Sequence, residues 1–461
     1  MALLVAILAA FFWPGVAMYD TVSQYDQVLS GDVTDWHPPI MVRLWQLLHP
    51  LGPGTAPMFV LQVGLYALGF GLMVAAVVRI NRPWAGIATA ILALSPLLFG
   101  WQMVVLKDTQ MQGALVAAFG IVAFHRLGGR QVPAALAGVA AVLIIYATLV
   151  RANAVFVTVP LGLMLLRRPM AMGPRAATAA GLVAGLLALS PTINDRLFGA
   201  SHSAVARSQP LFDLAAIAVA TPDTPSPFTP SERVQIVARH CVKAFFWDPL
   251  GDPSACAPVT ARLNHESDKT LYLALVSAAA THPLAYAEHR FRHWNSTERW
   301  LVSPGLTDAG PPDEAEPNEL GLKSPPSSVV PAWQSVAAVE AASPLGWPIV
   351  WTVLGLVLLP AAWRQRGSEA GALALALLVS ALLLEASFLA ISIASDLRYH
   401  LWPMTAVALA LILLADGRPR RSETVIGASL LMLVIAGGIV SRATLPRAPD
   451  SYQGMIHWAY G

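Results

Sequence analysis

The sequence predicts an all-α, polytopic membrane protein with about eleven transmembrane helices and a helical periplasmic cap formed by outer loops. Three observations support this fold class. Hydrophobic residues make up 56% of the chain and charged residues only 12%, whereas soluble domains carry about 25% charged residues. Apolar segments close to the roughly 20 residues that cross a bilayer recur along the chain. Arginines also gather in alternate short loops, as they do on the cytoplasmic side of membranes.

The predicted spans divide the chain into three regions. Residues 1–193 form an N-terminal membrane module of about seven helices, which includes a first periplasmic loop at residues 19–56. Residues 194–343 form the periplasmic loop that makes the cap, and residues 344–461 form a C-terminal membrane module of about four helices. Helices are expected because an open sheet would leave backbone groups unpaired in lipid. The spans are 2–18, 57–78, 84–100, 110–125, 132–149, 153–166, 176–193, 345–362, 370–394, 399–415 and 424–441.

The first span is predicted to stay in the mature chain. Residues 1–18 lack a basic segment at their start, although Gly15-Val16-Ala17 resembles a signal-peptidase site. Cleavage there would leave Asp20 on a free terminus and would disturb the alternation of the loops. An uncleaved span is therefore favoured over a removed signal peptide.

The placement of arginines predicts that the N-terminus faces the cytoplasm. In that orientation every short cytoplasmic loop is basic, as with Arg79 and Arg82 in one loop and Arg126 and Arg130 in the next. Because short cytoplasmic loops retain Lys and Arg, the long loop is expected on the outer face. In a chain of this Ala- and Arg-rich, bacterial character, that is the periplasmic face of the inner membrane. The net charge is only +2 and no basic tract suits nucleic acid, so the predicted partners are membrane lipids and not nucleic acids.

The outer loops are predicted to be partly helical. The runs YDTVSQYDQVLSG and IMVRLWQLLHPLG of the first loop have helical spacing, and the second lies along the interface or is an ordinary connecting helix. In the long loop, helices are expected over residues 231–247 and 269–300, and a Pro- and acid-rich stretch at 304–328 is expected to be mobile. Cys241 and Cys256 are predicted to form a disulfide in an oxidising compartment, with two free thiols as the alternative.

Short polar clusters fall at the ends of apolar segments on the predicted outer face. Helix ends that meet at one interface suit chemistry on a lipid-borne substrate. The clusters are Asp20 with Asp35-Trp36-His37-Pro38-Pro39, Lys107-Asp108, Arg151 with Asn153, and Asp396-Leu397-Arg398-Tyr399-His400.

Each acidic cluster has a catalytic and a structural interpretation. Asp20, placed directly after the first span, can act as a general base on an acceptor hydroxyl or amine, or it can cap the next helix. Asp35 and His37 stand beside a proline pair that fixes the backbone. They can bind a phosphate or a sugar hydroxyl, or they can belong to a turn anchored by Trp36 at the interface.

The basic clusters suit a phosphate. Lys107 can neutralise one as a point charge, or it can extend to water from the membrane edge. Arg151, in a very short link, matches phosphate geometry with its planar fork or forms a salt bridge with Asp20, Asp108 or Asp396. Arg398 can clamp a phosphate while Tyr399 stacks or donates a hydrogen bond, or both residues can anchor the chain at the interface.

Glu385 supports a different function. It lies within the predicted span 370–394, and an acid inside a membrane is a functional candidate by default. It is the main support for the alternative of a glycolipid transporter or flippase, although a protonated Glu385 bonded to a neighbouring helix is an equal interpretation. The sequence contains no P-loop, nucleophile elbow, zinc-protease motif or dinucleotide fingerprint.

These motifs together resemble the GT-C superfamily of integral-membrane glycosyltransferases, which use polyprenyl-phosphate sugars. The resemblance rests on Asp20 in the first outer loop, Lys107-Asp108 before the fourth span and Arg398-Tyr399 near the last outer turn. The run from YDTVSQYDQVLSG to DWHPP is similar to a group of uncharacterised bacterial members. Many members have two adjacent acids in the first loop, whereas Thr21 follows Asp20 here and no clear D-x-D is present.

The resemblance implies transfer of a hexose or pentose, with inversion, from a polyprenyl-phosphate donor to a lipid, glycan or protein acceptor at the periplasmic face. It implies Asp20 as the catalytic base and the other clustered residues as the substrate-binding set. No metal ligand is assigned. A requirement for a divalent metal, Mg or Mn, stays open because the second acid is missing. The predicted substrate-binding residues are Asp35, His37, Lys107, Asp108, Arg151, Asn153, Arg398, Tyr399 and His400.

Overall fold

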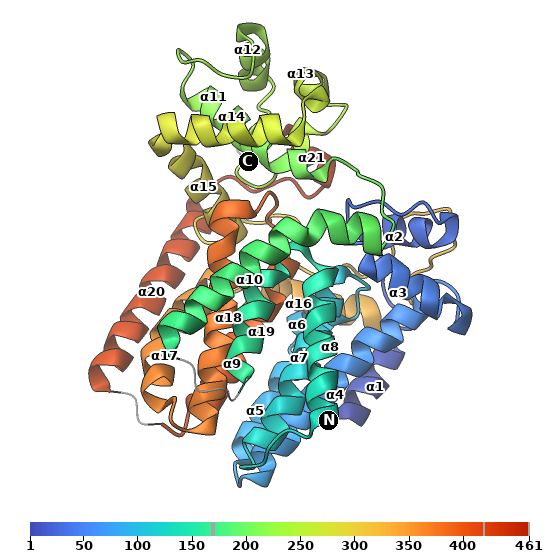
Figure 1. The fold of residues 1–461 in the computed structure, drawn as a ribbon, viewed down its shortest axis with the longest axis vertical. Helices are drawn as coiled ribbons and strands as arrows, with labels where there is room; N and C mark the ends of the chain where they lie inside the picture. The colour runs from blue at the N-terminus through green and yellow to red at the C-terminus, as the bar shows by residue number, and fades with distance from the viewer. Residues whose placement is uncertain (167–170, 418–419, 460–461) are drawn as a thin grey trace.

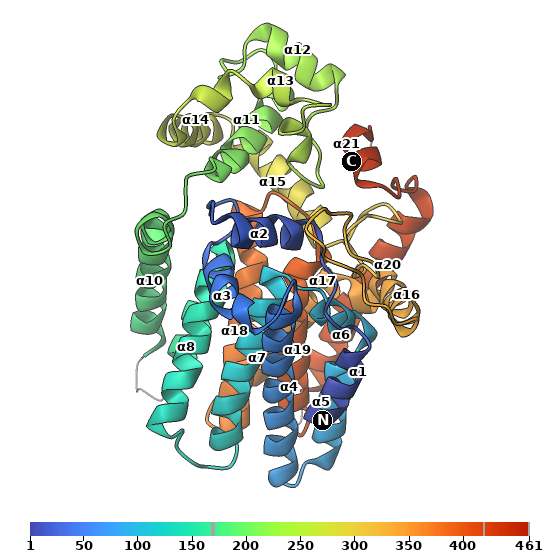
Figure 2. The same cartoon turned by 90° about the vertical axis from the view of Figure 1, so that its right-hand side faces the viewer.

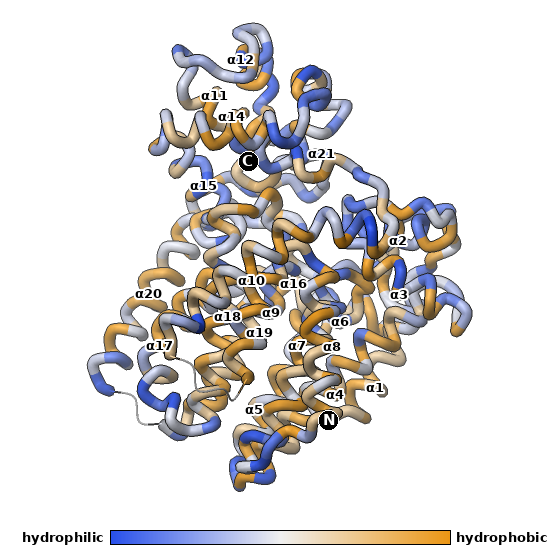
Figure 3. The backbone as a smooth tube through the Cα atoms, viewed as in Figure 1, coloured by the Kyte–Doolittle hydropathy of each residue, from blue (hydrophilic) through white to orange (hydrophobic). Residues whose placement is uncertain are grey.

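The computed structural model describes residues 1–166, 171–417 and 420–459, and over these ranges the chain is helical with no β-strand. A large helical bundle carries a smaller helical cap at one end (Figure 1). The N-terminus lies toward the opposite end of the bundle, and the C-terminal residues lie beside the cap. The bundle is largely hydrophobic, whereas the cap and the loops at the far end are more hydrophilic (Figure 3).

Helix α7 (Lys107–Arg126) is the centre of the N-terminal half of the bundle. It packs against α4 (Ala56–Arg79), α8 (Ala134–Val150) and α19 (Leu401–Leu414). Nearly all of its side chains are buried, including those of Asp108, Thr109 and Gln110 in its polar first turn. A helix enclosed on several sides can hold polar groups in fixed positions at its end.

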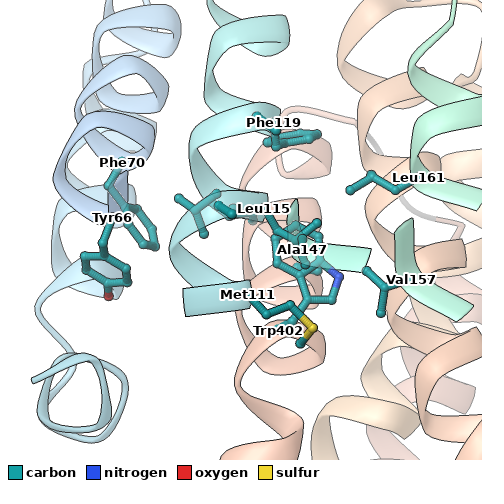
Figure 4. Close-up of a cluster of buried hydrophobic side chains, with 14 of the residues drawn as sticks. Tyr66, Phe70, Met111, Leu115, Phe119, Ala147, Val157, Leu161 and Trp402 are labelled. Carbon is teal, nitrogen blue, oxygen red and sulfur yellow. The ribbon is translucent and has the colours of Figure 1, made fainter. Parts of the chain in front are cut away.

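Aromatic and aliphatic side chains fill the space around α7. Met111, Leu115 and Phe119 of α7 lie between Phe70 of α4 and Trp402 of α19 (Figure 4). All five side chains are buried. Tight packing of this kind fixes the position of α7 against its neighbours.

Helices α4 and α7 approach so closely that their contact requires glycine. A Cβ added to Gly69 would lie 2.4 Å from the backbone carbon of Val116, and one added to Gly120 would lie 2.6 Å from the Gly69 carbonyl oxygen. Both neighbours are backbone atoms, so a rotamer change cannot relieve the clash.

We expect Gly69→Ala to destabilise the protein by about 1–3 kcal/mol, because the added methyl group overpacks a backbone contact. Gly64→Ala on the same helix is the matched control, since a Cβ there meets no atom within 4 Å. Alanine should be neutral or stabilising by up to about 1 kcal/mol at that position. Thermal unfolding of the purified protein in detergent measures both, and equal melting temperatures for the two variants would contradict the packing argument.

The C-terminal half packs around α18 (Glu369–Ile391). This helix contacts α19, α17 (Pro348–Gln365) and α9 (Val155–Leu165), and its contact with α9 joins the two halves. Helix α20 (Arg421–Thr444) packs on the outer side of α17. The Asp396–Arg398 turn, which connects α18 to α19, is thereby brought toward the start of α7.

Six helices are long and apolar enough to cross a membrane by length and composition, over the part of the chain that the structure describes. A seventh is counted if the bent pair of α5 (Pro83–Ala93) and α6 (Pro96–Gln102), whose axes differ by 56°, forms one broken span. These helices indicate a multi-pass helical membrane protein, but the prediction of about eleven spans is wrong. The six are Ala56–Arg79, Met172–Leu197, Pro348–Gln365, Glu369–Ile391, Leu397–Leu414 and Arg421–Thr444.

The remaining predicted spans correspond to shorter or more polar helices. Helix α1 is only Ala2–Ala10, because the chain turns at Trp13-Pro14-Gly15, where Gly15 has a φ of +100°. Helices α8 and α9 are apolar but have 17 and 11 residues. Hydropathy counted each apolar run as a span and did not detect these breaks.

The first outer loop contains α2 (Tyr19–Ser30) and α3 (Ile40–Leu48), where the sequence predicted two helices. Helix α2 lies across the outer end of the bundle, beneath the cap (Figure 2). Trp45 of α3 is buried while Leu47 on the other side is exposed, so α3 is amphipathic.

The cap is built mainly from the long loop and has its own apolar core. This core includes Phe212, Leu271 and the C-terminal Met455, and the Cys241–Cys256 disulfide lies within it. A 15-residue loop closed by a disulfide contributes about 3 kcal/mol in the chain-entropy account. The cap helices are α11 (Ser208–Ala220), α12 (Pro230–Ala238), α13 (Ala257–Thr260), α14 (Asp268–Thr281), α15 (Pro283–Thr297) and α21 (Tyr452–His457).

Three details of the long loop differ from the prediction. The helix expected over 231–247 ends at Ala238, and the one expected over 269–300 is divided at Pro283, because proline lacks the N–H that would continue it. Helix α16 (Val329–Ala342) packs on α6 beside the bundle and is not part of the cap. The long loop therefore covers the side of the bundle as well as its end.

Candidate active site

Two distant segments lie side by side at the outer end of α7. The Val105 N–H donates to the Val16 carbonyl at 2.9 Å, and the Thr21 hydroxyl donates to the Val105 carbonyl at 2.5 Å. These bonds align the start of α2 with the start of α7. They consequently bring Asp20, in the first turn of α2, opposite Lys107, the first residue of α7.

Asp20 is held by two cations. Its Oδ2 accepts from the Lys107 Nζ at 2.6 Å and pairs with the Arg398 Nη2 at 3.2 Å. The Nδ1 of His37 lies 3.0 Å from the same Lys107 Nζ, and its Nε2 is 3.8 Å from Asp20 Oδ1. Since an ammonium group only donates, His37 Nδ1 accepts and the Nε2 carries the proton.

A second set of pairs continues from Arg398. Its Nη2 is 3.0 Å from Asp396 Oδ2, and its Nε is 3.9 Å from Asp108 Oδ2. Asp108 also forms an ion pair with Arg151. The guanidinium carbon of Arg151 lies 4.1 Å from the centre of the Tyr399 ring, and that of Arg398 lies 5.6 Å from it. Both contacts are in the range of cation–π interactions.

We call these six charged residues the ion-pair network. It contains three cations and three carboxylates, so its formal charge is zero. At most 14% of any of their side chains is exposed. The network consists of Lys107, Arg151, Arg398, Asp20, Asp108 and Asp396.

One donor of the network is unused. The Arg398 Nη1 is buried and has no hydrogen-bond partner within the described ranges. A buried donor without a partner costs about 1–3 kcal/mol. The network can therefore accept an anionic oxygen without first losing a bond from that nitrogen.

The surroundings set the protonation states of Asp20 and His37. Burial alone would raise the pKa of Asp20, but Arg398, Lys107 and His37 hold it well below its usual range. Burial and the Lys107 charge lower the pKa of His37 to about 3, against the opposing effect of Asp20. At neutral pH, Asp20 is ionised and weakly basic, and His37 is a neutral donor.

Arg151 is also buried, and burial lowers its pKa to about 10. It remains protonated at neutral pH and therefore adds a positive charge beside Asp108. Asn153, predicted as a substrate ligand, accepts from the Arg151 Nε at 2.6 Å. Its position orients the Arg151 side chain.

Two predicted site residues point elsewhere. Asp35 accepts from the Ser203 N–H and hydroxyl, both at 2.6 Å, and lies 3.0 Å from His202 Nδ1. It thus joins the first outer loop to the chain that leads into the cap. His400 faces away from the network, because the 3₁₀ turn at Leu397–His400 points successive side chains in different directions.

Glu385 forms a buried cluster with His400. The His400 Nδ1 lies 2.8 Å from a Glu385 oxygen, and both side chains are almost fully buried. Glu298, also buried, accepts from the Thr352 hydroxyl at 3.0 Å and interacts electrostatically with Glu385. Glu385 lies near the outer end of α18, within about two turns of Ile391. Glu298 was not among the residues that the sequence singled out.

Asp308 and Asp248 are two further acids near the network that the sequence analysis missed. Asp248 accepts from the Tyr452 hydroxyl at 2.5 Å. Burial raises its pKa to about 6, with smaller contributions from Asp396, Asp308 and Asp20. Both acids come from the long loop, where no local motif distinguishes them from the other acidic residues.

An apolar cavity of about 680 Å³ lies among α7, α8, α9 and α10 (Met172–Thr192). Arg126 lines it, as do Thr148 and Thr158, whose hydroxyls are 2.8 Å apart. Thr148 precedes Arg151 by less than one helical turn. The cavity therefore extends toward the segment that supplies one cation of the network.

The donor set of the network does not fit a divalent metal. Each of its carboxylates pairs with a cation, and within the described residues no group of three or more His, Cys, Asp or Glu side chains is placed to hold a metal ion. Magnesium and manganese prefer carboxylate oxygens without competing cations. The network therefore offers no free set of carboxylate ligands to such an ion.

No family model and no curated protein matches the sequence. Among solved structures, the chain is similar to the archaeal oligosaccharyltransferase AglB from Archaeoglobus fulgidus in complex with an inhibitory peptide and a dolichol-phosphate. The TM-score is 0.36 and the sequence identity is 14%. The match covers 95% of this chain and 55% of that chain, so this chain spans about half the length of that protein.

Proposed function

We propose that the protein is an integral-membrane glycosyltransferase of the GT-C type, which transfers a sugar from a polyprenyl-phosphate donor to a cell-envelope acceptor. The observation that carries this proposal is the ion-pair network, in which charged residues from distant segments meet at the outer end of the bundle. The proposed location is the periplasmic side of a bacterial inner membrane, where lipid-linked sugars and envelope acceptors meet.

The three cations supply the electrostatics that sugar transfer from a phosphate needs. As the bond between the anomeric carbon and the phosphate oxygen breaks, negative charge grows on the leaving polyprenyl phosphate. Fixed cations in a buried site stabilise such charge without reorganising. Arg398 has an Nη1 that is without a partner among the described residues and can donate to a phosphate oxygen. Lys107 directly precedes Asp108 in the chain, and Arg151 pairs with the Asp108 carboxylate.

The cavity gives the lipid tail a place near these cations. An apolar volume of about 680 Å³ among α7, α8, α9 and α10 suits several isoprene units. Burial of each CH₂ group contributes about 0.8 kcal/mol. We propose that the donor lies with its chain in this cavity and its phosphate at the network.

We propose that the Asp20 carboxylate lies at the reaction centre, but its ion pairs limit its ability to act as a general base. While it pairs with Lys107 and Arg398, its low pKa makes it a poor proton acceptor. The same pairs give it a positioning role, because a carboxylate between two cations keeps them close together. A donor phosphate that binds both cations would compete directly with Asp20.

The test is mass spectrometry of envelope glycolipids and glycans from a deletion strain of the source organism. We expect one sugar increment to disappear on deletion and to return with the wild-type gene. Lys107→Met, at equal membrane abundance, should restore less than about one hundredth of it, a loss typical of one electrostatic group. An unchanged glycan and glycolipid profile after deletion would contradict the proposal.

The same strain tests the transporter alternative. Its main support was Glu385, which is bonded to His400 and buried beside Glu298. If Glu385→Gln failed to restore the sugar increment while Lys107→Met restored it fully, transport would replace transfer as the better explanation.

A further inference from the structure

The irregular segment at residues 306–316 is fastened tightly over the ion-pair network, although its composition predicted mobility. Its backbone bonds to four separate parts of the protein. The Arg299 guanidinium donates to the Leu306 and Thr307 carbonyls at 3.3 and 2.6 Å. The Leu397 N–H donates to the Asp308 carbonyl at 3.0 Å, and the Trp101 indole donates to the Ala309 carbonyl at 3.2 Å. The Glu316 N–H donates to the Ala17 carbonyl at 2.8 Å.

This fastening places Asp308 beside Arg398. The N–H that bonds to the Asp308 carbonyl belongs to Leu397, the residue directly before Arg398. Arg299 also donates to the Ser395 carbonyl at 3.0 Å, and so ties the Asp396–Arg398 turn to the same segment. Asp308 consequently interacts electrostatically with Asp396 and Arg398.

The backbone at Asp308 is held in a conformation that few residues adopt. Its φ is +57°, in the left-handed region, where Asp, Asn and Gly are the residues best tolerated. Arg299, whose guanidinium bonds to the neighbouring carbonyls, has a φ of +51°. Unfavourable backbone conformations that the surrounding contacts maintain cluster at functional sites.

Asp308 also differs from the acids of the network in its partners. Asp20, Asp108 and Asp396 each form an ion pair with a cation, whereas none of the ion pairs within residues 1–166, 171–417 and 420–459 includes Asp308. The neighbouring Thr307 favours its ionised form only weakly, and the Thr307 hydroxyl makes no hydrogen bond within these ranges. The lone pairs of the Asp308 carboxylate are therefore free to accept a proton.

We infer that Asp308 is the general base that deprotonates the acceptor, while Asp20 positions the cations. This inference rests on the proposed glycosyl transfer. In the step, the acceptor O–H or N–H proton passes to the Asp308 carboxylate, and the acceptor atom bonds to the anomeric carbon. The bond from that carbon to the phosphate oxygen breaks, and the electron pair leaves with the polyprenyl phosphate.

The protonation behaviour of Asp308 agrees with this role. Burial, followed by the nearby Asp396 carboxylate, raises its pKa to about 6 against the opposing charges of Arg398 and Arg299. A base is most effective when its pKa lies near the working pH. Because the carboxylate must be ionised, transfer should be constant above this pKa and should fall as the pH decreases through about 6.

Asp248 is the alternative candidate for the general base. It too has a pKa raised to about 6, and it faces Asp308, Asp396 and Tyr452. However, the Tyr452 hydroxyl donates to its carboxylate at 2.5 Å, and it lies on the cap turn Asp248–Leu250. Its backbone is not bonded to Leu397, the neighbour of Arg398, whereas that of Asp308 is.

The experiment compares Asp308→Asn, Asp308→Gly, Asp248→Asn and Asp313→Asn in broken envelopes of the deletion strain, which contain donor and acceptor together. The rate at which the sugar increment appears is measured from pH 5 to 8. Asparagine and glycine both tolerate the left-handed backbone, so both keep the segment's conformation and remove the base. Asp313 is an exposed acid of the same segment and controls for its total charge.

We expect both Asp308 variants to lose about 10²–10⁴-fold in rate, the usual contribution of a general base. The residual transfer rate of these variants should no longer decrease as the pH drops below 6. The transfer rate of Asp248→Asn should still decrease as the pH drops below 6, and the rate of Asp313→Asn should match that of the wild type at every pH. Inhibition by added undecaprenyl phosphate should be unchanged in the Asp308 variants, because the three cations remain.

Three results would overturn the assignment: a wild-type rate in Asp308→Asn, a residual rate that still falls below pH 6, or loss of that fall in Asp248→Asn instead. If wild-type envelopes add no sugar at any pH, the proposed transfer itself is wrong, and the role of Asp308 is rejected with it. The wild-type control therefore distinguishes the two failures.

Discussion

Arg398→Lys is expected to lower the rate of sugar transfer by about 10²–10³-fold, the effect of removing one preorganised electrostatic group. The substitution keeps a positive charge beside Asp20 and Asp396, but it removes the planar fork that contacts both. It also removes the buried Nη1 that has no partner within the described residues. An ammonium group has three donors, but they rotate on a flexible stem and are not held in the rigid planar fork that matches carboxylate and phosphate oxygens.

Two controls separate this loss from misfolding. Arg447→Lys changes an exposed arginine that pairs with Asp450 and should leave transfer unchanged. Arg398→Ala should destabilise the protein by about 3–5 kcal/mol, because it leaves buried carboxylates without their cation. The rate in broken envelopes and the melting temperature in detergent measure the two effects. Full activity in Arg398→Lys would show that charge alone suffices and that the fork has no role.

The sequence predicted the long apolar helices better than it predicted the number of spans. Helices such as α4 and α18 contain a continuous apolar run, which hydropathy detects directly. Helix α7 begins with Lys107-Asp108-Thr109-Gln110, and its burial depends on the helices that surround it. The turn after α1 and the bend between α5 and α6 depend on local backbone geometry, which composition does not report.

Part of the site could also be predicted. Asp20, Lys107, Asp108, Arg151 and Arg398 follow or precede apolar segments at one interface, and the structure brings all five into one network. Other residues close to these five in sequence, such as His400, do not join the network. The directions of side chains in a tight turn, like the course of an irregular loop, are set by tertiary contacts.

Asp308 is an example of a site residue that the sequence could not predict. Asp308 stands among several acids in a Pro-rich stretch that reads as mobile, and nothing in the local sequence singles it out. Its position depends on hydrogen bonds from Arg299 and Leu397, residues that no pattern links to it. Only the folded arrangement shows that this segment lies on the network.

Asp20→Asn separates a positioning acid from a catalytic base. If Asp20 positions Lys107 and Arg398, its removal should reduce transfer by about 10²-fold or more, the loss expected from misplaced electrostatic groups. It should also tighten the binding of undecaprenyl phosphate, because both cations lose their competing carboxylate. A gain of about tenfold would correspond to 1.4 kcal/mol.

The binding of undecaprenyl phosphate to purified wild type and Asp20→Asn, measured by thermal shift in detergent, tests this directly. The fall in transfer below pH 6 provides the second readout, and it should persist in Asp20→Asn if Asp308 is the base. Unchanged binding together with loss of that fall would assign the proton transfer to Asp20. Asparagine is nearly isosteric with aspartate, so the first turn of α2 and its bond from Thr21 to Val105 should remain intact. Tighter product binding with slower transfer is then the signature of a carboxylate that competes with the donor phosphate for the same cations.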